Sequence, residues 1–345
     1  MLWFIGLGIS GTRSIPTKAV KIIQEADSVY LETFTSPISK QDEEEIKNMV
    51  SGNFKIAKRW LVEDGQEILK TAKNSTVILL SYGDPYVATT HIELRTRAKL
   101  ENIETSTIYS ASAITSMIGE VGLQFYKVGR IVTIMNEKKS TTTPYTTIFK
   151  NLTQGLHSVI LLEYNHDENY FLDPRHAISN LLNVEKEQKR NAINDDTFAI
   201  IASRIGFDTQ KIVSGKFSSL LKADFGEPPH SMIVTGKLHF TELDSITVMT
   251  DCLDKPSDNS GVIKTTSVQM IERYVPMVRK ALEEIKPLYN DSKEFQEVFD
   301  NAKLYIDDAE NFLKQGKDEN AVLSIGYADG LVDALRIAKG IDPKM

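Results

Sequence analysis

Short apolar runs alternate with segments of helical spacing over the first 110 residues of this 345-residue chain. The apolar runs predict buried strands, whereas Ile15–Ala26 and Thr90–Glu101 repeat apolar residues three and four apart and predict helices. Strands that alternate with helices indicate βαβ units and a largely parallel sheet. The predicted strands are Leu2–Ile9, Ser28–Glu32, Val77–Ser81 and Thr105–Tyr109.

A second section of α/β character follows. Its helix is predicted over Leu172–Glu187, opened by Asp173-Pro174, because proline is favoured at the first helical position. The polar stretch Lys138–Pro144 predicts a surface loop, and Asp195-Asp196 predicts a turn rather than a pair of catalytic carboxylates. The predicted strands are Ile131–Met135, Ser158–Tyr164, Thr197–Ser203 and Ser231–Thr235.

The character of the chain changes after residues 254–261, whose Pro, Ser, Asn and Gly predict a linker. Three later segments have helical apolar spacing and predict an all-α bundle of about three helices. Pro276 should kink or divide the first helix. Asp291-Ser292 can cap the second, and Gly316 and Gly340 can end the second and third. We therefore predict an N-terminal α/β domain at 1–110, a second α/β domain at 111–253, the linker at 254–261 and a helical domain at 262–345.

Charge and cysteine content argue against several classes of protein. A formal net charge of −7 disfavours a nonspecific nucleic-acid-binding protein, which usually carries a basic stripe. The single cysteine, Cys252, excludes an intramolecular disulfide and favours a cytoplasmic location. No apolar run approaches the ~20 residues of a membrane helix, and the N-terminus lacks the basic leader of a signal peptide. We expect a cytoplasmic protein that binds neither membranes nor nucleic acid directly.

The first glycine-bearing segment formally fits a dinucleotide-binding fingerprint. Gly6, Gly8 and Gly11 have the spacing, and Glu32 lies where a ribose-binding acid would stand. In that fingerprint, however, the helix begins directly on the glycines so that its N-terminus can hold the pyrophosphate. Here Pro16 marks the predicted helix start, so dinucleotide binding is disfavoured. A second alternative is a turn at the strand end that binds no ligand.

The second glycine-bearing segment, Gly83-Asp84-Pro85, follows the predicted strand that ends at Ser81. Glycine lets the backbone approach a ligand closely, and Asp84 could meet an amino group, a ribose hydroxyl or the positive field of a sulfonium. The alternative is a capped turn before a helix. Ligands of open α/β sheets bind outside the carboxyl ends of strands, so both glycine segments predict one small-molecule site.

A third segment places His230 after Pro228-Pro229, at the entrance to a predicted strand. His230 can be a ligand contact or proton acceptor, or a structural residue. The six histidines show no metal-ligand spacing, so we predict no metal site. The sequence also shows neither a Ser-His-Asp order nor a nucleophile elbow, and it identifies no catalytic residue.

Taken in order, several segments resemble the diphthine synthase family of the tetrapyrrole-methylase-like superfamily over about residues 1–250. The resemblance implies two αβα domains of the tetrapyrrole methylase type with the cofactor cleft between them. It also implies a homodimer that uses S-adenosyl-L-methionine, releases S-adenosyl-L-homocysteine and needs no metal. The implied reaction is repeated methylation of the amine of 3-amino-3-carboxypropyl-histidine in translation elongation factor 2, which gives diphthine in diphthamide biosynthesis. The segments are Phe4–Gly8, Gly83–His91, Gly155–His157, Asp195–Thr197, Asp224–His230 and Gly236–His239.

The same resemblance implies the cofactor contacts, position by position. The family commonly has serine where this chain has Ala113, so a hydroxyl contact there would require Ser112 to substitute. The contact list is dominated by apolar residues, as expected for transfer from an activated sulfonium, where the protein mainly positions the nucleophile and excludes water. The implied cofactor-binding residues are Ile9, Asp84, Val87, Ala113, Ile114, Leu162, Ile205 and His230.

Two other functions are kept as alternatives. One is a related methylase that acts on a tetrapyrrole or on ribosomal RNA, and the other is a scaffold that binds the cofactor without turnover. The C-terminal helices lie outside the main resemblance and resemble a small archaeal domain family of unknown function. They can serve stability or dimerisation, or they can dock the elongation factor or another partner.

Overall fold

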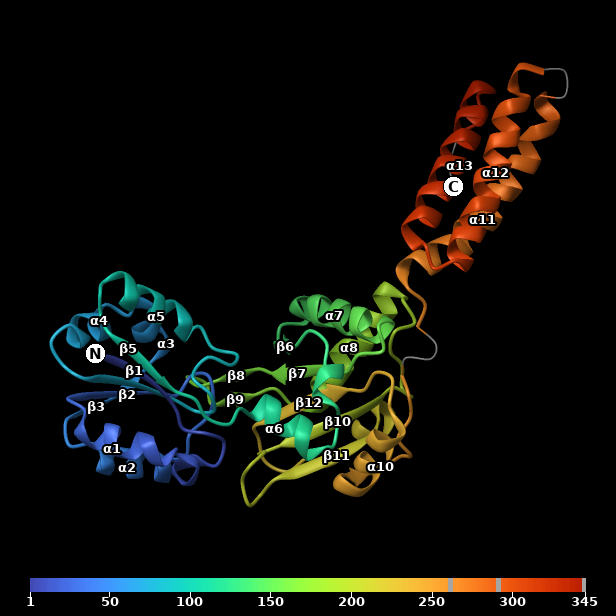
Figure 1. Ribbon diagram of the computed structural model, residues 1–345. Coiled ribbons are helices and arrows are strands. Elements are labelled where there is room, and N and C mark those ends of the chain that lie inside the picture. The colour runs from blue at the N-terminus through green and yellow to red at the C-terminus, as the bar shows by residue number, and fades with distance from the viewer. Residues whose placement is uncertain (260–262, 290–292, 343–345) are drawn as a thin grey trace. The chain divides into compact units, whose positions relative to one another are not determined.

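The computed structural model describes residues 1–259, 263–289 and 293–342, and these form two compact units, Met1–Gly261 and Val262–Met345. The first unit contains two large sheets, each with its own helices, and a two-stranded hairpin (Figure 1). The second contains three long helices. The predicted mixture of α/β and all-α parts is confirmed.

The first sheet has five parallel strands in the order β3-β2-β4-β1-β5. Alternate residues of β1 point to opposite faces: Phe4 packs with helices α3 to α5, and Ile5 packs with α1 and α2. Every residue of the central strand β4 is buried, as expected for a parallel sheet covered on both faces. The bounds are β1 Leu2–Gly6, α1 Thr17–Glu25, β2 Ser28–Glu32, α2 Lys40–Met49, β3 Asn53–Ala57, α3 Arg59–Asp64, α4 Gln66–Ala72, β4 Val77–Ser81, α5 His91–Leu100 and β5 Thr105–Ile108.

The second sheet is mixed, with strand order β13-β11-β10-β12-β7-β6. Strand β10 runs antiparallel to both β11 and β12, so this section is less parallel than the first. A two-stranded hairpin, β8 and β9, extends beyond the sheet. The bounds are α6 Ala113–Glu120, β6 Val132–Ile134, α7 Thr142–Thr153, β7 Ser158–Leu162, β8 Tyr164–Asn165, β9 Tyr170–Phe171, α8 Pro174–Gln188, β10 Phe198–Ser203, β11 Lys211–Lys216, α9 Phe217–Leu220, β12 His230–Val234, α10 Phe240–Met249 and β13 Asp251–Cys252.

The surface loop predicted at Lys138–Pro144 is wrong. A short 3-10 helix, Lys138–Thr141, leads directly into α7, and Thr141 and Pro144 are buried. Proline is tolerated near a helix start because the first N–H groups lack intrahelical partners. The other proline-led helix, α8, begins as predicted: Asp173 Oδ1 accepts a hydrogen bond of 2.7 Å from Arg175 N–H.

The second unit is a bundle of α11 Thr266–Ile285, α12 Gln296–Lys314 and α13 Asp318–Ala338 around a shared apolar core. Pro276 does not divide α11, which continues through it. The proline is exposed, so the carbonyl that loses its hydrogen bond can be hydrated, while Val275 and Val278 anchor the helix on its buried side. Gly316 and Gly340 follow α12 and α13 in left-handed conformation, as predicted. The predicted cap Asp291-Ser292 lies outside the described residues.

Candidate functional site

The two glycine-bearing segments lie side by side because β1 and β4 are neighbours in the first sheet. The Gly8 N–H donates to Gly83 O at 3.2 Å, and the Gly83 N–H donates to Gly8 O at 2.8 Å. A Cβ atom on Gly6 would lie 2.5 Å from Gly83 O, so only glycine permits this close approach. The two segments therefore form one continuous wall at the carboxyl edge of the sheet. Helix α1 begins only at Thr17, which agrees with the rejection of a dinucleotide fingerprint.

Asp84 presents a carboxylate from a tightly braced turn. Its Oδ1 accepts a 2.9 Å hydrogen bond from Tyr86 N–H, and Oδ2 has no hydrogen-bond partner among the described residues. His91, at the start of α5, holds the other side of the turn through Nδ1, which lies 2.9 Å from Pro85 O and donates to it. Burial lowers the pKa of His91 to about 4, so its ring is neutral near pH 7.

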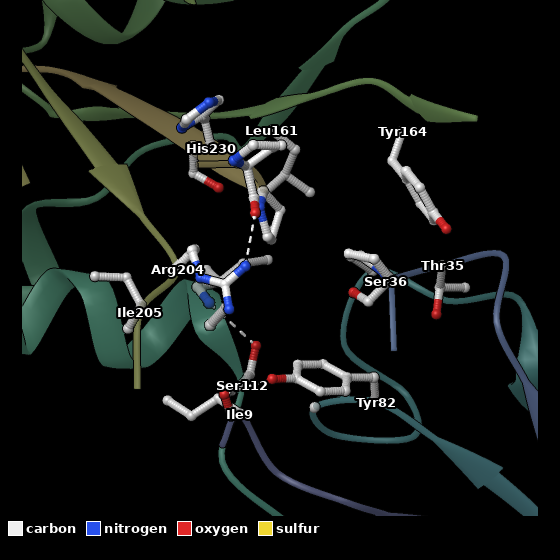
Figure 2. Close-up of a pocket in the computed structure, with 18 of the residues that line it drawn as sticks. Ile9, Thr35, Ser36, Tyr82, Ser112, Leu161, Tyr164, Arg204, Ile205 and His230 are labelled. Atoms are coloured by element: carbon white, nitrogen blue, oxygen red, sulfur yellow. Dashed lines mark hydrogen bonds between the residues drawn. The ribbon is translucent and has the colours of Figure 1, made fainter. Parts of the chain in front are cut away.

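These segments line a cavity of about 590 Å³, a size typical of small-molecule sites (Figure 2). Its opposite wall comes from the second sheet, at the ends of β7 and β10 and the start of β12. All eight residues with an expected cofactor contact lie along this cavity: Ile9, Asp84, Val87, Ala113, Ile114, Leu162, Ile205 and His230. The structure brings them together, and their role in cofactor binding stays a prediction.

His230 occupies its place because of strand register. It is the first residue of β12 and pairs with Ser203, the last residue of β10. The Ser203 Oγ and His230 Nδ1 atoms are 2.7 Å apart. Burial lowers the pKa of His230, which favours a neutral ring at the cavity wall. The Pro228-Pro229 peptide bond that precedes this strand is cis.

Ala113, which stands where the family commonly has serine, is the first residue of α6. Ser112 is the N-cap, and its Oγ accepts a hydrogen bond of 3.3 Å from Ile114 N–H. Ser112 also lines the cavity. Its hydroxyl proton is not used by that cap, so Ser112 can still donate a hydrogen bond toward the cavity.

Sequence reasoning missed several polar and aromatic residues of the lining. The loop after β2 contributes Thr35 and Ser36, and the residue after β4 is Tyr82. The rule that ligands meet the carboxyl ends of strands could have pointed to both segments. Arg204 and Tyr164 follow β10 and β7 in the second sheet, where no motif marks them.

Direct contacts join the two walls within the first unit. The Tyr82 ring is nearly parallel to that of Phe207, with centroids 6.3 Å apart and planes at 6°. Ser10 Oγ donates to Gly206 O at 2.5 Å. At the hairpin, His166 Nε2 lies 3.3 Å from Thr33 Oγ1 in the loop after β2. The cavity therefore depends on residues far apart in the sequence.

Glu32 ends β2 directly before the lining loop, and its side chain is 1% exposed. Its Oε2 accepts hydrogen bonds from Phe34 N–H at 3.2 Å and Thr35 N–H at 3.1 Å, and its Oε1 accepts one from the Thr35 hydroxyl. The carboxylate is thus used within its own loop rather than to bind a ribose. Burial raises the pKa of Glu32 to about 7, although the Thr35 and Phe34 hydrogen bonds oppose the shift.

We expect Glu32→Gln to remove one contribution to the pH dependence of stability. Because the pKa of Glu32 rises from 4.5 to about 7 on folding, its contribution to the stability of the wild-type protein should be lost as pH increases through that interval. The loss amounts to about 3 kcal/mol, and glutamine cannot ionise. Urea denaturation between pH 5 and 8 measures the effect. Glu44→Gln, at an exposed site, is the control, and parallel curves for wild type and Glu32→Gln would contradict the prediction.

The described residues contain no group of three or more His, Cys, Asp and Glu side chains suited to a metal ion. Within the same ranges, no helix has the length and apolar character needed to cross a membrane.

Comparisons with known proteins define the class. The profile of the family described as "Tetrapyrrole (Corrin/Porphyrin) Methylases" matches residues 1–221. The diphthine synthase of Methanocaldococcus jannaschii is 36% identical over 251 residues, which is 71% of this chain and 97% of the relative. That of Methanothermobacter thermautotrophicus is 34% identical, over 71% of this chain and 93% of the relative. A crystal structure of diphthine synthase has 29% identity and a TM-score of 0.64, over 76% of this chain and 99% of that one.

The chain therefore belongs to the diphthine synthase family of the tetrapyrrole methylases. It is an S-adenosylmethionine-dependent methyltransferase of diphthamide biosynthesis, and the family resemblance seen in the sequence is confirmed. The C-terminal part matches a second family, described as "Protein of unknown function (DUF357)", over residues 273–341, which agrees with the resemblance expected for the helices.

Proposed function

We propose that this chain binds S-adenosyl-L-methionine in the cavity and transfers its methyl group to the amine of 3-amino-3-carboxypropyl-histidine in translation elongation factor 2. One observation carries the placement of the cofactor: the eight expected contacts, separated by up to 221 residues between Ile9 and His230, line one cavity. Repeated transfer gives diphthine. The product is S-adenosyl-L-homocysteine.

The chemical character of the lining fits this cofactor. Apolar side chains such as Ile9 and Ile205 can cover the adenosine of the cofactor. The Asp84 carboxylate can accept a hydrogen bond from the ribose hydroxyls or the amino group of the cofactor, or it can interact with the positive charge of its sulfonium. Gly83 leaves open space beside the backbone, since an added Cβ would meet only Ala111 O, at 3.8 Å. A ligand can therefore approach the main chain closely at this turn.

S-adenosyl-L-methionine, when bound, supplies a methyl group that its sulfonium has already activated. The residues of the chain hold the acceptor amine in line with that group and exclude water. The amine must be unprotonated to react, and apolar surroundings lower its pKa because they disfavour the charged form. None of these tasks requires a covalent intermediate on the protein.

The domain division and the assembly state belong to the same proposal. We infer α/β domains at 1–110 and 111–253, joined by the segment between β5, which ends at Ile108, and α6. A linker at 254–261 precedes a helical domain at 262–345. Family membership supports a cytoplasmic homodimer with elongation factor 2 as its protein substrate, without a resident metal.

A labelled-methyl assay tests this function. The protein is incubated with methyl-labelled S-adenosyl-L-methionine and elongation factor 2 that carries the aminocarboxypropyl group, and label is expected on the factor. Unmodified factor, a porphyrinoid and ribosomal RNA are the comparison acceptors. Label on a porphyrinoid or RNA alone would favour the related methylases, and cofactor binding without transfer to any acceptor would favour a scaffold.

A further inference from the structure

Arg204 is the one side chain with a permanent positive charge among the described residues that line the cavity. It directly follows β10, and its side chain is 26% exposed. In Figure 2 its guanidinium extends into the space between His230 and Ser112. Such a charge in a largely apolar cavity favours an anionic partner, because a charge is less well solvated there than in bulk water.

The structure holds this guanidinium in a fixed position. Its Nε donates to Thr209 Oγ1 at 2.6 Å, and its Nη1 donates to Pro228 O at 3.3 Å. The guanidinium carbon lies 4.8 Å from the centroid of the Phe207 ring, within the range of a cation–π contact. Phe207 in turn faces Tyr82 on the opposite wall. Arg204 is therefore positioned before any ligand arrives.

The backbone at Arg204 is in a conformation that most residues avoid. Its φ is +51°, in the left-handed region, although it is not a glycine. Such a conformation costs about 1–3 kcal/mol and persists where the surroundings over-determine it. Here the Arg204 N–H donates to Pro229 O at 3.0 Å, which ties the residue to the turn before β12. Figure 2 shows the side chain of this residue pointing into the cavity.

The guanidinium is only loosely neutralised. Glu227 Oε2 lies 3.6 Å from Nη1, beyond hydrogen-bond distance, and the Glu227 side chain is 79% exposed. Nη2 makes no hydrogen bond to any residue in the described ranges. An exposed glutamate can move away at little cost, so Arg204 can offer two parallel N–H groups to an incoming carboxylate.

We propose that Arg204 binds the α-carboxylate of the acceptor's 3-amino-3-carboxypropyl group. This inference rests on the proposed function, in which the acceptor carries a carboxylate beside the amine that is methylated. The carboxylate is unchanged by methylation of the neighbouring amine. One Arg204 contact therefore orients the acceptor in every round of transfer, while the amine grows bulkier with each methyl group.

The donor also carries an α-amino-carboxylate at its methionyl end, so the test must separate the two sources. For wild type, Arg204→Gln and Arg204→Lys, we would measure the KM of the modified elongation factor, kcat, and the Kd of S-adenosyl-L-homocysteine by calorimetry. Arg204→Gln should raise the acceptor KM about tenfold to a hundredfold and leave the Kd within about twofold. Arg204→Lys should recover only part of the loss, because lysine lacks the planar fork.

Two further variants provide a control for the loss of an arginine and a test of the competing carboxylate. Arg13→Gln is the matched control: Arg13 is 64% exposed, pairs with Asp208 at 3.1 Å and does not line the cavity, so its acceptor KM should equal that of wild type. Glu227→Gln removes the competing carboxylate and should lower the acceptor KM about twofold to threefold. A purely structural role for Arg204 would not produce this opposite change.

The outcomes distinguish this inference from the proposed function. An unchanged acceptor KM in Arg204→Gln would overturn the inference alone. An equal loss of S-adenosyl-L-homocysteine affinity would also overturn it and assign Arg204 to the donor. If the wild-type protein methylates no form of elongation factor 2, the proposed function fails and this inference with it. Retained S-adenosyl-L-homocysteine binding shows that each variant is folded.

Discussion

Replacing Glu242 with alanine is expected to lower the free energy of unfolding of the first unit by about 3–5 kcal/mol. Glu242 is fully buried in α10 and joins three segments of the second sheet's domain. Its Oε1 accepts from Gln124 N–H at 2.9 Å and from His157 Nε2 at 3.0 Å. Its Oε2 accepts from His239 N–H at 2.8 Å and pairs with Lys127.

The size of this loss follows from what alanine leaves behind. Lys127 would keep a half-buried charge without its partner, and His157, itself fully buried, would lose the acceptor for its Nε2 proton. The other nitrogen of His157 already accepts from Gly236 N–H at 2.9 Å, so the ring cannot turn to find a substitute without losing that bond. Each unsatisfied buried group costs about 1–3 kcal/mol, more when it is charged.

Acid should weaken the same network. Burial alone would raise the pKa of Glu242, but hydrogen bonds from His239, Lys127, Gln124 and His157 overcome it and lower the pKa to about 2. A depressed pKa contributes stability above the ordinary value of 4.5, and that contribution is lost as the pH falls toward 2.

Urea unfolding followed by circular dichroism at pH 7 measures the effect of Glu242→Ala. Asp244→Ala is a matched control, because Asp244 is exposed on the same helix and should change stability by less than about 0.5 kcal/mol. A loss below about 1 kcal/mol for Glu242→Ala would show that the network does not hold these segments together.

Asp84→Ala is expected to weaken binding of S-adenosyl-L-homocysteine about tenfold to a hundredfold. A hydrogen bond to a charged group is worth about 1.5–3 kcal/mol, and Asp84 is the braced carboxylate of the first wall, 9% exposed. Alanine also removes the acceptor for Tyr86 N–H, which loosens the turn.

Asp84→Asn separates these two effects. Asparagine keeps an acceptor for Tyr86 N–H but lacks the negative charge, so its loss of affinity should be intermediate. Isothermal titration calorimetry gives both values, with Asp195→Ala, at an exposed turn, as the control. Affinity equal to that of wild type in Asp84→Ala would remove Asp84 from the cofactor site.

The sequence predicted the first sheet well because its strands are buried on both faces. Ser28–Glu32 and Val77–Ser81 match β2 and β4 residue for residue, since largely apolar runs that end at turns leave little choice of boundary. Strand β3 was missed because it lies at the sheet edge, where only alternate residues are partly covered. The first predicted strand, Leu2–Ile9, is too long because the chain leaves the sheet after Gly6.

The site was predicted only in part. Residues near glycine or proline motifs, such as Asp84 and His230, could be found because glycine and proline indicate where the backbone turns at the end or start of a strand. Arg204 could not be found in this way, and Glu32 was named only as a candidate ribose-binding acid. Arg204 follows an apolar strand that carries no motif, and its position depends on a hydrogen bond to the turn before β12. Glu32 is buried because the loop after β2 packs around it.

The hydrogen bond between Ser10 and Gly206 spans 196 residues of chain. During synthesis the first sheet can fold once its strands have emerged, but the cavity cannot close until β10 and β12 have left the ribosome and paired. Contacts of such long sequence separation form late, because their loop-closure entropy is unfavourable until other contacts reduce it. Binding of S-adenosyl-L-homocysteine is therefore expected only after both sheets of the first unit have folded.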